Sequence, residues 1–241
     1  MIKQFLACGL AAIVFATGIA QADEASVKKA VEARLGQKAR VDEVRKTGVL
    51  DLYEVREGSD LYYADENANY LFFGHIIDAK SRRNLTEERR KKLLQIKFSD
   101  LPLALAIKTV RGNGKRVFAT FEDPNCGYCK KLATELVGMT DFTMYTFLYP
   151  ILSPDSEEAA KAIWCAGDND SRVKAWNDWM LRDTTLRSPN CNAPLSKITA
   201  LGRKLSIRGT PAIILGNGER IPGFMPVVQL EKELNRVAAE K

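Results

Sequence analysis

Two cysteines separated by two residues, placed where an apolar strand gives way to a helix, constrain this chain more than any other feature. The motif is Cys126-Gly127-Tyr128-Cys129, and the apolar run over 115–121 before it is typical of a buried strand. Residues 122–125 interrupt that run with acids and a proline, and leucines at helical spacing follow the motif. The sequence therefore predicts a strand, a turn and a helix, with Cys126 at the helix N-terminus.

A cysteine pair in this position is typical of a reversible dithiol. The first turn of a helix presents unpaired N–H groups and the positive end of the helix dipole, both of which favour a thiolate. The motif therefore predicts a lowered thiol pKa for Cys126 and a redox function that needs no cofactor. A zinc site would need two more ligands, and His75, Cys165 and Cys191 do not stand at metal-ligand spacing. We therefore expect no metal.

The first 22 residues have the pattern of a cleavable secretory signal. Lys3 precedes a mostly apolar run over 5–20, and Ala20-Gln21-Ala22 supplies small residues at the cleavage position. The run is shorter than the roughly 20 residues of a membrane-spanning helix, so we expect a soluble mature chain. We expect cleavage after Ala22 and export into an oxidising compartment.

The mature chain keeps two further cysteines. Cys165 lies in an apolar helical stretch, and Cys191 lies in a loop between Pro189 and Pro194. An even number of cysteines suits two pairs in an oxidising compartment. A bond between these two would close a loop of about 27 residues and contribute on the order of 3.5 kcal/mol to stability. We expect a structural disulfide; free thiols or a second redox pair are the alternatives.

Basic residues outnumber acidic ones, with a formal net charge of +6, but most of them are scattered. The densest run, 89–92, follows two glutamates and precedes apolar residues, as on the solvated face of an amphipathic helix. No nucleic-acid-binding motif accompanies the run. Nucleic acid is therefore not an expected partner.

The pattern of the chain changes near residue 84, which predicts two domains. Residues 23–83 have the pattern of a short helix followed by short strands at 41–44, 50–56, 60–64 and 70–77. A segment of about 60 residues has a marginal core, so we expect it to pair with a second copy. Asn84 and Glu87 have the spacing of a capping box, which predicts a polar linker helix over 84–97.

Residues 98–241 have an α/β pattern with an inserted group of helices. The expected elements are strand 115–121, helix 126–137, strand 142–149, helices near 155–166, 170–182 and 194–206, a hairpin around 216–218 and a helix over 227–238.

These features together resemble a known family. The segments 121–130, 209–212 and 217–224 resemble those of periplasmic disulfide isomerases of the DsbC and DsbG type, whose catalytic domain has the thioredoxin-like fold. The resemblance implies an α+β N-terminal dimerisation domain, a helical linker and a thioredoxin-like α/β domain with a helical insertion. It implies a homodimer paired through strand 70–77, whose interface contains Phe72, Phe73, Gly74 and His75.

The resemblance also implies a mechanism. Cys126 attacks a non-native disulfide, and Cys129 can release the mixed disulfide. Substrate contacts fall on Tyr128, Thr210 and Pro211, the last being a cis-proline that faces the cysteines. The implied partners are misfolded disulfide-containing proteins, which such isomerases also serve as chaperones, and a membrane reductase of the DsbD type that donates electrons.

One position departs from the thioredoxin-family pattern. The carboxylate that accepts a proton from the second cysteine commonly lies six residues before the first cysteine, where this chain has Thr120. Glu122 and Asp123 lie closer, but acids in a turn are more often solvated or capping residues, so the proton acceptor stays unassigned. Two other functions remain open: a DsbA-like thiol oxidase, and a non-enzymatic periplasmic holdase whose thiols are incidental.

Overall fold

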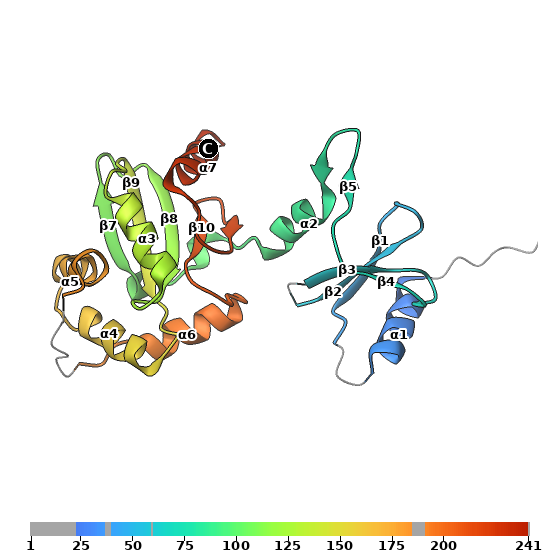
Figure 1. Cartoon of the computed structure of the whole chain (residues 1–241), viewed down its shortest axis with the longest axis horizontal. Coiled ribbons are helices and arrows are strands. Elements are labelled where there is room, and N and C mark those ends of the chain that lie inside the picture. Colours follow the sequence, from blue (N-terminus) through green and yellow to red (C-terminus); the bar gives the residue numbers. More distant parts are fainter. Residues whose placement is uncertain (1–22, 37–39, 59, 185–190, 241) are drawn as a thin grey trace, which may run out of the picture. The chain divides into compact units, whose positions relative to one another are not determined.

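The computed structural model describes residues 23–36, 40–58, 60–184 and 191–240 (Figure 1). The expected signal peptide lies outside these residues. Within them, no helix is long and apolar enough to cross a membrane. Contacts divide the chain into two compact units: the first runs to Glu57 and adds Leu61–Phe73, while the second contains Gly58–Asp60 and resumes at Gly74.

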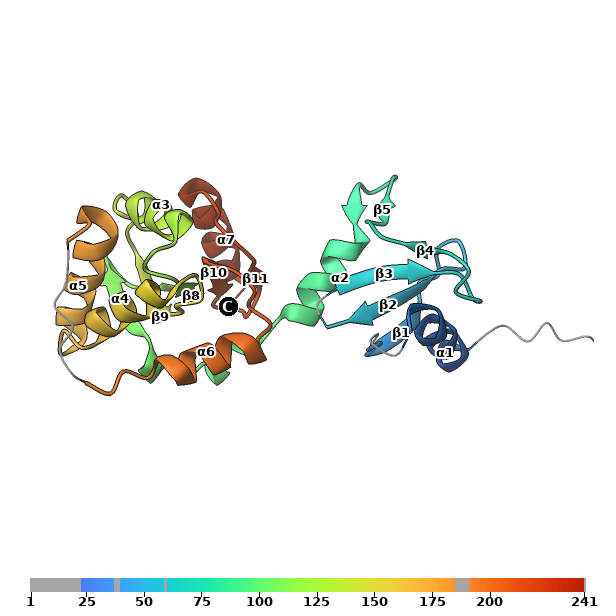
Figure 2. The same cartoon turned by 60° about the horizontal axis from the view of Figure 1, so that its bottom comes forward.

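The first unit packs one helix against a four-stranded sheet (Figure 2). Helix α1 (Glu24–Leu35) begins after Asp23, whose carboxylate accepts a hydrogen bond from Ser26 N at 2.7 Å. The strand order is β1-β2-β3-β4, and the bounds are β1 Glu43–Lys46, β2 Tyr53–Glu57, β3 Asp60–Ala64 and β4 Leu71–Phe72. Val27 and Val31 of α1 are fully buried with Tyr53 and Val55, which form the small core that the sequence predicts.

The single strand expected over 70–77 is wrong. Only Leu71–Phe72 pairs with β3, whereas β5 (Ile77–Asp78) forms a separate hairpin with β6 (Arg83–Asn84). Between them, the backbone of Ile76 bonds to the linker: its N–H donates to Thr86 Oγ1 at 2.9 Å, and its carbonyl accepts from Leu85 N at 2.9 Å. The start of the linker helix thus takes the backbone groups that a continuing strand would use.

The linker helix α2 spans Leu85–Leu94, starting where the sequence predicts and ending earlier. The Asn84 side chain caps it by accepting from Glu87 N at 3.0 Å. The chain after the helix joins the turn between β10 and β11, where Ile96 N donates to Gly218 O at 3.1 Å. A Cβ on Gly218, which has φ of +86°, would lie 1.6 Å from Ile96 O, so this junction requires glycine.

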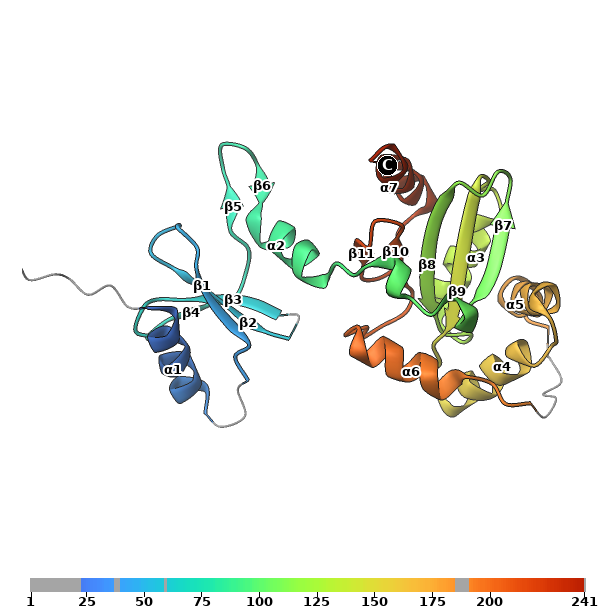
Figure 3. The ribbon, with the colours of Figure 1, turned by 180° about the vertical axis from the view of Figure 1, so that it is seen from behind.

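The second unit contains a five-stranded sheet of order β11-β10-β8-β9-β7 (Figure 3). Strands β8 and β9 are parallel, and every other neighbouring pair is antiparallel. The bounds are β7 Ile107–Arg111, β8 Arg116–Glu122, β9 Phe142–Leu148, β10 Ala212–Leu215 and β11 Arg220–Ile221. Strand β7 was not predicted, because only its first residue is buried.

Helices complete two cores on this sheet. In the first core, Leu132 of α3 and Leu230 of α7 pack with Phe118 of β8. In the second core, Ile163 of α4 and Ile198 of α6 pack with Phe121 of the same strand. The bounds are α3 Gly127–Leu136, α4 Pro154–Trp164, α5 Asn169–Arg182, α6 Leu195–Lys204 and α7 Val227–Ala239, with short 3-10 helices at Phe98–Asp100 and Leu103–Leu105. The cores place the start of α3 at the carboxyl end of β8.

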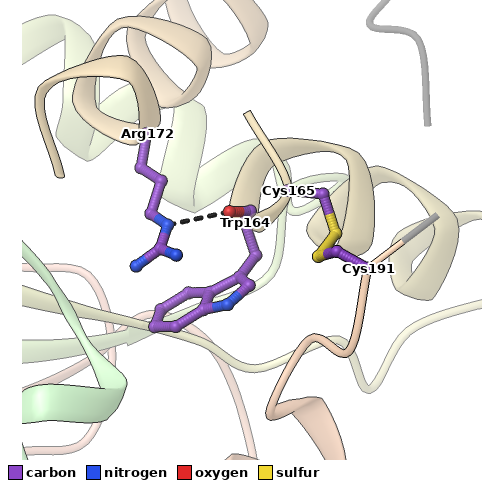
Figure 4. The surroundings of a disulfide bond; sticks show 4 residues. All are labelled: Trp164, Cys165, Arg172 and Cys191. Carbon is purple, nitrogen blue, oxygen red and sulfur yellow. Dashed lines mark hydrogen bonds between the residues drawn. A yellow bond between two sulfur atoms is a disulfide. The ribbon is translucent and has the colours of Figure 1, made fainter. Parts of the chain in front are cut away.

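A disulfide joins Cys165, the residue after α4, to Cys191 ahead of α6, with 5.8 Å between the Cα atoms (Figure 4). Beside it, Arg172 Nε donates to Trp164 O at 2.8 Å, and the Arg172 guanidinium lies 3.8 Å from the centre of the Trp164 ring. The bond therefore closes a loop that contains the whole of α5.

We expect mild reductant to open an oxidised Cys126–Cys129 pair before it opens Cys165–Cys191. Structural disulfides have potentials below about −300 mV, whereas catalytic ones of oxidising compartments lie near −120 to −180 mV. That gap of at least about 120 mV corresponds to more than roughly 5 kcal/mol. Mass mapping after graded dithiothreitol treatment measures the order; simultaneous reduction of both pairs, or a free Cys165 thiol in the oxidised protein, would contradict the structural role.

Candidate active site

Cys126 is the residue that caps α3. Its N–H donates to Asp123 O at 3.0 Å, which closes the turn after β8, and its Sγ accepts from Cys129 N at 3.4 Å. Both cysteines are free thiols. Cys126 is 6% exposed and Cys129 is 0% exposed, so of the two only Cys126 reaches the solvent boundary.

The second half of the site comes from the segment before β10. The peptide bond between Thr210 and Pro211 is cis, and the Cys126 thiol donates to Thr210 O at 3.3 Å. Pairing of Ala212 with Phe121 holds β10 beside the end of β8, which brings these distant segments together. The Thr210 hydroxyl oxygen is buried and has no hydrogen-bond partner among the described residues.

Tyr128 projects from the first turn of α3. It is 63% exposed, and its ring centre lies 5.8 Å from that of Phe224, in the segment before α7. The side chain is therefore available at the surface next to the cysteines, while one side of its ring is supported by a neighbour.

Asp123 is not a solvated turn acid. It is 0% exposed, and its carboxylate accepts hydrogen bonds from Asn125 N at 2.8 Å, Ile151 N at 2.8 Å and Leu152 N at 3.0 Å. The bond from Asn125 closes the turn before Cys126, and the other two tie that turn to the chain that follows β9. The acid therefore has a structural task that its sequence position did not reveal.

Glu122 also lies inside the protein, because β8 continues through it and pairs it with Leu148. It is 1% exposed; Oε1 accepts from Thr120 Oγ1 at 2.7 Å, and Oε2 is buried without a partner among the described residues. Burial raises the pKa of Glu122 to about 7, against the opposing effect of the bond from Thr120. Burial, and after it the charge of Glu122, also raise the pKa of Cys129.

The alternation of β8 explains how Glu122 reaches the site. Residues 118, 120 and 122 point to one face of the sheet, and Phe118 on that face packs against Leu132 of α3. A carboxyl two positions after Thr120 therefore stays on the face covered by the helix that carries Cys129. The spacing of these three residues is visible in the sequence, but the sequence does not show that β8 continues as far as Glu122, and the two adjacent acids favoured a turn.

Helix α5 supports the reactive turn from outside. Trp179 Nε1 donates to Pro124 O at 2.9 Å, and Lys130 of α3 forms an ion pair with Asp183 at the end of α5. These contacts connect the helical insertion to both sides of the cysteine motif.

The four residues expected at a dimer interface are divided between the two units. Phe72 and Phe73 belong to the first unit and are 49% and 76% exposed. His75 belongs to the second: its Nδ1 lies 3.3 Å from Asn84 Nδ2 and 3.6 Å from the Glu87 carboxylate, at the start of α2, and Gly74 precedes it. In the described part of the chain, no group of three or more His, Cys, Asp or Glu side chains could hold a metal ion.

Comparison with known proteins agrees with this architecture. The model of the disulfide bond isomerase protein N-terminal domain matches residues 18–87, and that of a thioredoxin-like domain matches residues 103–238. The chain is 48% identical over 208 residues to a probable thiol:disulfide interchange protein DsbC of Bordetella pertussis, covering 85% of this chain and 73% of the relative. It is 30% identical over 230 residues to DsbC of Salmonella typhimurium, covering 93% and 92%.

A solved structure shows the same relationship. The disulfide interchange protein of Neisseria gonorrhoeae is 40% identical and superposes with a TM-score of 0.53, covering 56% of this chain and 97% of the solved one. The two domain matches and the identity over most of both chains show that this chain belongs to the DsbC family of thiol:disulfide interchange proteins.

Proposed function

We propose that this chain rearranges non-native disulfides of exported proteins, with Cys126 as the attacking thiol and Cys129 as the resolving thiol. The observation that carries the proposal is the position of Cys126: its sulfur caps α3 and lies 3.3 Å from Thr210 O beside the cis peptide bond. A substrate that pairs with the backbone of this segment would present its disulfide to Cys126.

The exchange balances as follows. The Cys126 thiolate attacks one sulfur of the substrate disulfide; a mixed disulfide forms, the substrate S–S bond breaks, and the second substrate sulfur leaves as a thiolate. When a substrate thiolate attacks the mixed disulfide, a new substrate disulfide forms and no electrons are transferred overall. When Cys129 attacks instead, the substrate gains two electrons and the enzyme becomes oxidised. Return to the dithiol then requires an external donor, for which we propose a membrane reductase of the DsbD type.

Substrate recognition at this site is assigned to Tyr128, Thr210 and Pro211. Proline offers no N–H, so the chain before it binds through the remaining backbone groups without reading side chains. Tyr128 adds exposed aromatic surface beside the cysteine. Such contacts suit a protein that acts on many misfolded chains and also binds them as a chaperone.

Glu122 is our candidate for the group that takes the proton from Cys129. A buried thiol whose pKa is raised is a poor nucleophile until a base removes its proton. A carboxyl with a pKa of about 7 can serve as that base near neutral pH, and Glu122 Oε2 has a free acceptor position. In this proposal Glu122 takes the role of the family carboxylate that commonly lies six residues before the first cysteine, where this chain has Thr120.

The remaining proposals concern assembly and location. We assign residues 1–22 to a signal peptide, 23–83 to a dimerisation domain, 84–97 to the linker and 98–241 to the catalytic domain, in a periplasmic homodimer. The exposed side chains of Phe72, in the two-residue edge strand β4, and of Phe73, directly after it, support pairing with a second copy.

Refolding of a scrambled multi-disulfide protein tests the function. We expect residues 23–241 to restore the native disulfides, and the fragment 84–241, which lacks residues 23–83 and contains both cores of the sheet, to fold as a monomer that reduces small disulfides. Without a second site held nearby, the fragment should isomerise at least about tenfold more slowly. Sedimentation gives the size of each protein.

The outcomes separate the alternatives. A dimeric fragment, or equal isomerisation by both proteins, would contradict the role of residues 23–83. A full-length protein that oxidises a reduced substrate but leaves a scrambled one unchanged would be an oxidase.

A further inference from the structure

One face of α3 leads away from the cysteines toward the start of α7. Tyr128, Lys131 and Glu135 are three and four positions apart, which places them on the same side of the helix. Each contacts the segment 224–227: the Tyr128 and Phe224 ring centres are 5.8 Å apart, Lys131 Nζ lies 4.6 Å from the Phe224 ring centre, and Glu135 Oε2 accepts from Val227 N at 2.9 Å. The motif helix and this segment therefore form one continuous surface.

The outer side of that surface is apolar and carries one unpaired positive charge. Tyr128 is 63% exposed, and Phe224, whose ring lies next to that of Tyr128, is partly buried. Lys131 is exposed and, within the described residues, interacts with the Phe224 ring and with no acid. We call Tyr128, Lys131 and Phe224 the aromatic platform.

The platform is held in place from below. Gly223 N donates to Ile221 O at 3.0 Å, Met225 packs against the core of the sheet, and Leu230 N donates to Pro226 O at 3.0 Å in the first turn of α7. A surface that is already ordered binds a flexible chain without an ordering cost of its own. The exposed ring of Tyr128, two residues after Cys126, therefore offers ordered apolar surface to a bound chain.

We propose that the aromatic platform selects disulfides whose cysteine has an aromatic side chain close by in sequence, and favours an acidic residue beside that side chain. The inference rests on the proposed function and specifies its substrate class. A substrate ring can stack on the exposed ring of Tyr128, which Phe224 supports, and a substrate carboxylate can pair with Lys131. Because Tyr128 is two residues from Cys126 and an extended chain advances about 3.3 Å per residue, the aromatic should lie within about three residues of the reacting cysteine.

Short peptides closed by one disulfide provide the test. Three peptides differ only beside one cysteine, with glycine, with tyrosine, or with tyrosine followed by glutamate. The reduced protein, residues 23–241, reduces each peptide, and the second-order rate constant is measured. Dividing it by the rate constant for reduction of the same peptide by dithiothreitol corrects for the intrinsic reactivity of the peptide disulfide. We expect the tyrosine peptide to react about fivefold faster than the glycine peptide. The added glutamate should give about a further twofold gain, which 1 M salt removes.

Variants assign the preference to the platform. Because the Phe224 ring supports that of Tyr128, Phe224→Ala should lower the tyrosine to glycine ratio toward one, and Phe224→Leu, which keeps apolar volume without a ring, should lower it less. Lys131→Gln should abolish the glutamate gain and keep the tyrosine preference. Val137→Ala, which changes an exposed apolar residue at the far end of α3, is the matched control and should keep both ratios.

Two results would overturn the inference: equal corrected rates for the tyrosine and glycine peptides, or variants of Phe224 that slow both peptides equally and leave the ratio unchanged. Failure to reduce either peptide is a different result, because it contradicts the proposed function itself.

Discussion

Cys126→Ala is expected to reduce disulfide exchange to the background rate, whereas Cys129→Ala should still attack substrates and then remain bound to them. Cys126 caps α3 beside Thr210 and reaches the solvent boundary, while Cys129 is completely buried. Without Cys126 no mixed disulfide can form. Without Cys129 the mixed disulfide forms normally, but the escape by internal attack is lost.

Non-reducing electrophoresis after mixing each reduced variant with a scrambled protein measures the difference. Cys129→Ala should accumulate a covalent complex that dithiothreitol dissolves, and Cys126→Ala should form none. Thermal unfolding of both variants, with Cys165–Cys191 intact, is the control for folding. If Cys126→Ala refolded the substrate as well as the parent protein, the thiols would be incidental and the protein a holdase.

Glu122→Gln has the second largest expected effect. The substitution keeps an acceptor for the Thr120 hydroxyl but removes the ionisable group, so resolution of a mixed disulfide by Cys129 should slow by on the order of 100-fold. In the parent protein the resolution rate should rise with pH through an inflection near pH 7, because Glu122 must be ionised to accept the proton. Quenched-flow measurement of resolution across pH 5 to 9 reveals whether the variant loses that inflection.

Thr120→Val is the matched variant for this experiment. The bond from Thr120 acts to lower the pKa of Glu122, so its removal should move the inflection to higher pH while a base remains. An unchanged pH profile in Glu122→Gln would show that another group accepts the proton.

The same carboxyl should leave a mark on stability. Its pKa is raised from an ordinary 4.5 to about 7 in the folded protein, so the favourable contribution of the protonated form is complete below about pH 4.5 and is lost as the pH rises through 7. The loss amounts to roughly 3 kcal/mol at about 1.36 kcal/mol per pKa unit. Denaturant unfolding of Glu122→Gln should therefore show a smaller decline between pH 5 and pH 8 than the parent protein.

The sequence predicts the strands β8 to β11 and the helices α3 to α7 within one or two residues, since their apolar residues face one core or the other with clear periodicity. Helix α5, for example, was expected over 170–182 and spans Asn169–Arg182. The same logic fails for β7, where alternate residues are exposed at the sheet edge. It fails again over 70–77, where apolar residues suggested a continuous strand. There the backbone N–H and carbonyl of Ile76 form hydrogen bonds with the start of the linker helix and not with a neighbouring strand.

The candidate site divides in a similar way. The cysteine motif and the segment around Pro211 follow from local patterns and from the resemblance, whereas Glu122 depends on how far β8 continues. An acid at the end of a strand and an acid at the start of a turn have the same local sequence, and only tertiary packing around Glu122 distinguishes them.

Because of the bond between Cys165 and Cys191, this thiol:disulfide interchange protein itself needs a disulfide to form during its own maturation. The bond closes the loop that contains α5, and α5 supplies the Trp179 hydrogen bond to Pro124 in the reactive turn. A chain made in a reducing compartment therefore lacks the disulfide that closes the loop containing α5, the helix that supports the turn before Cys126. Recombinant material from a reducing cytoplasm and material from an oxidising compartment are chemically different proteins, although their sequences are identical, and the maturation history of each preparation belongs with its measured activity.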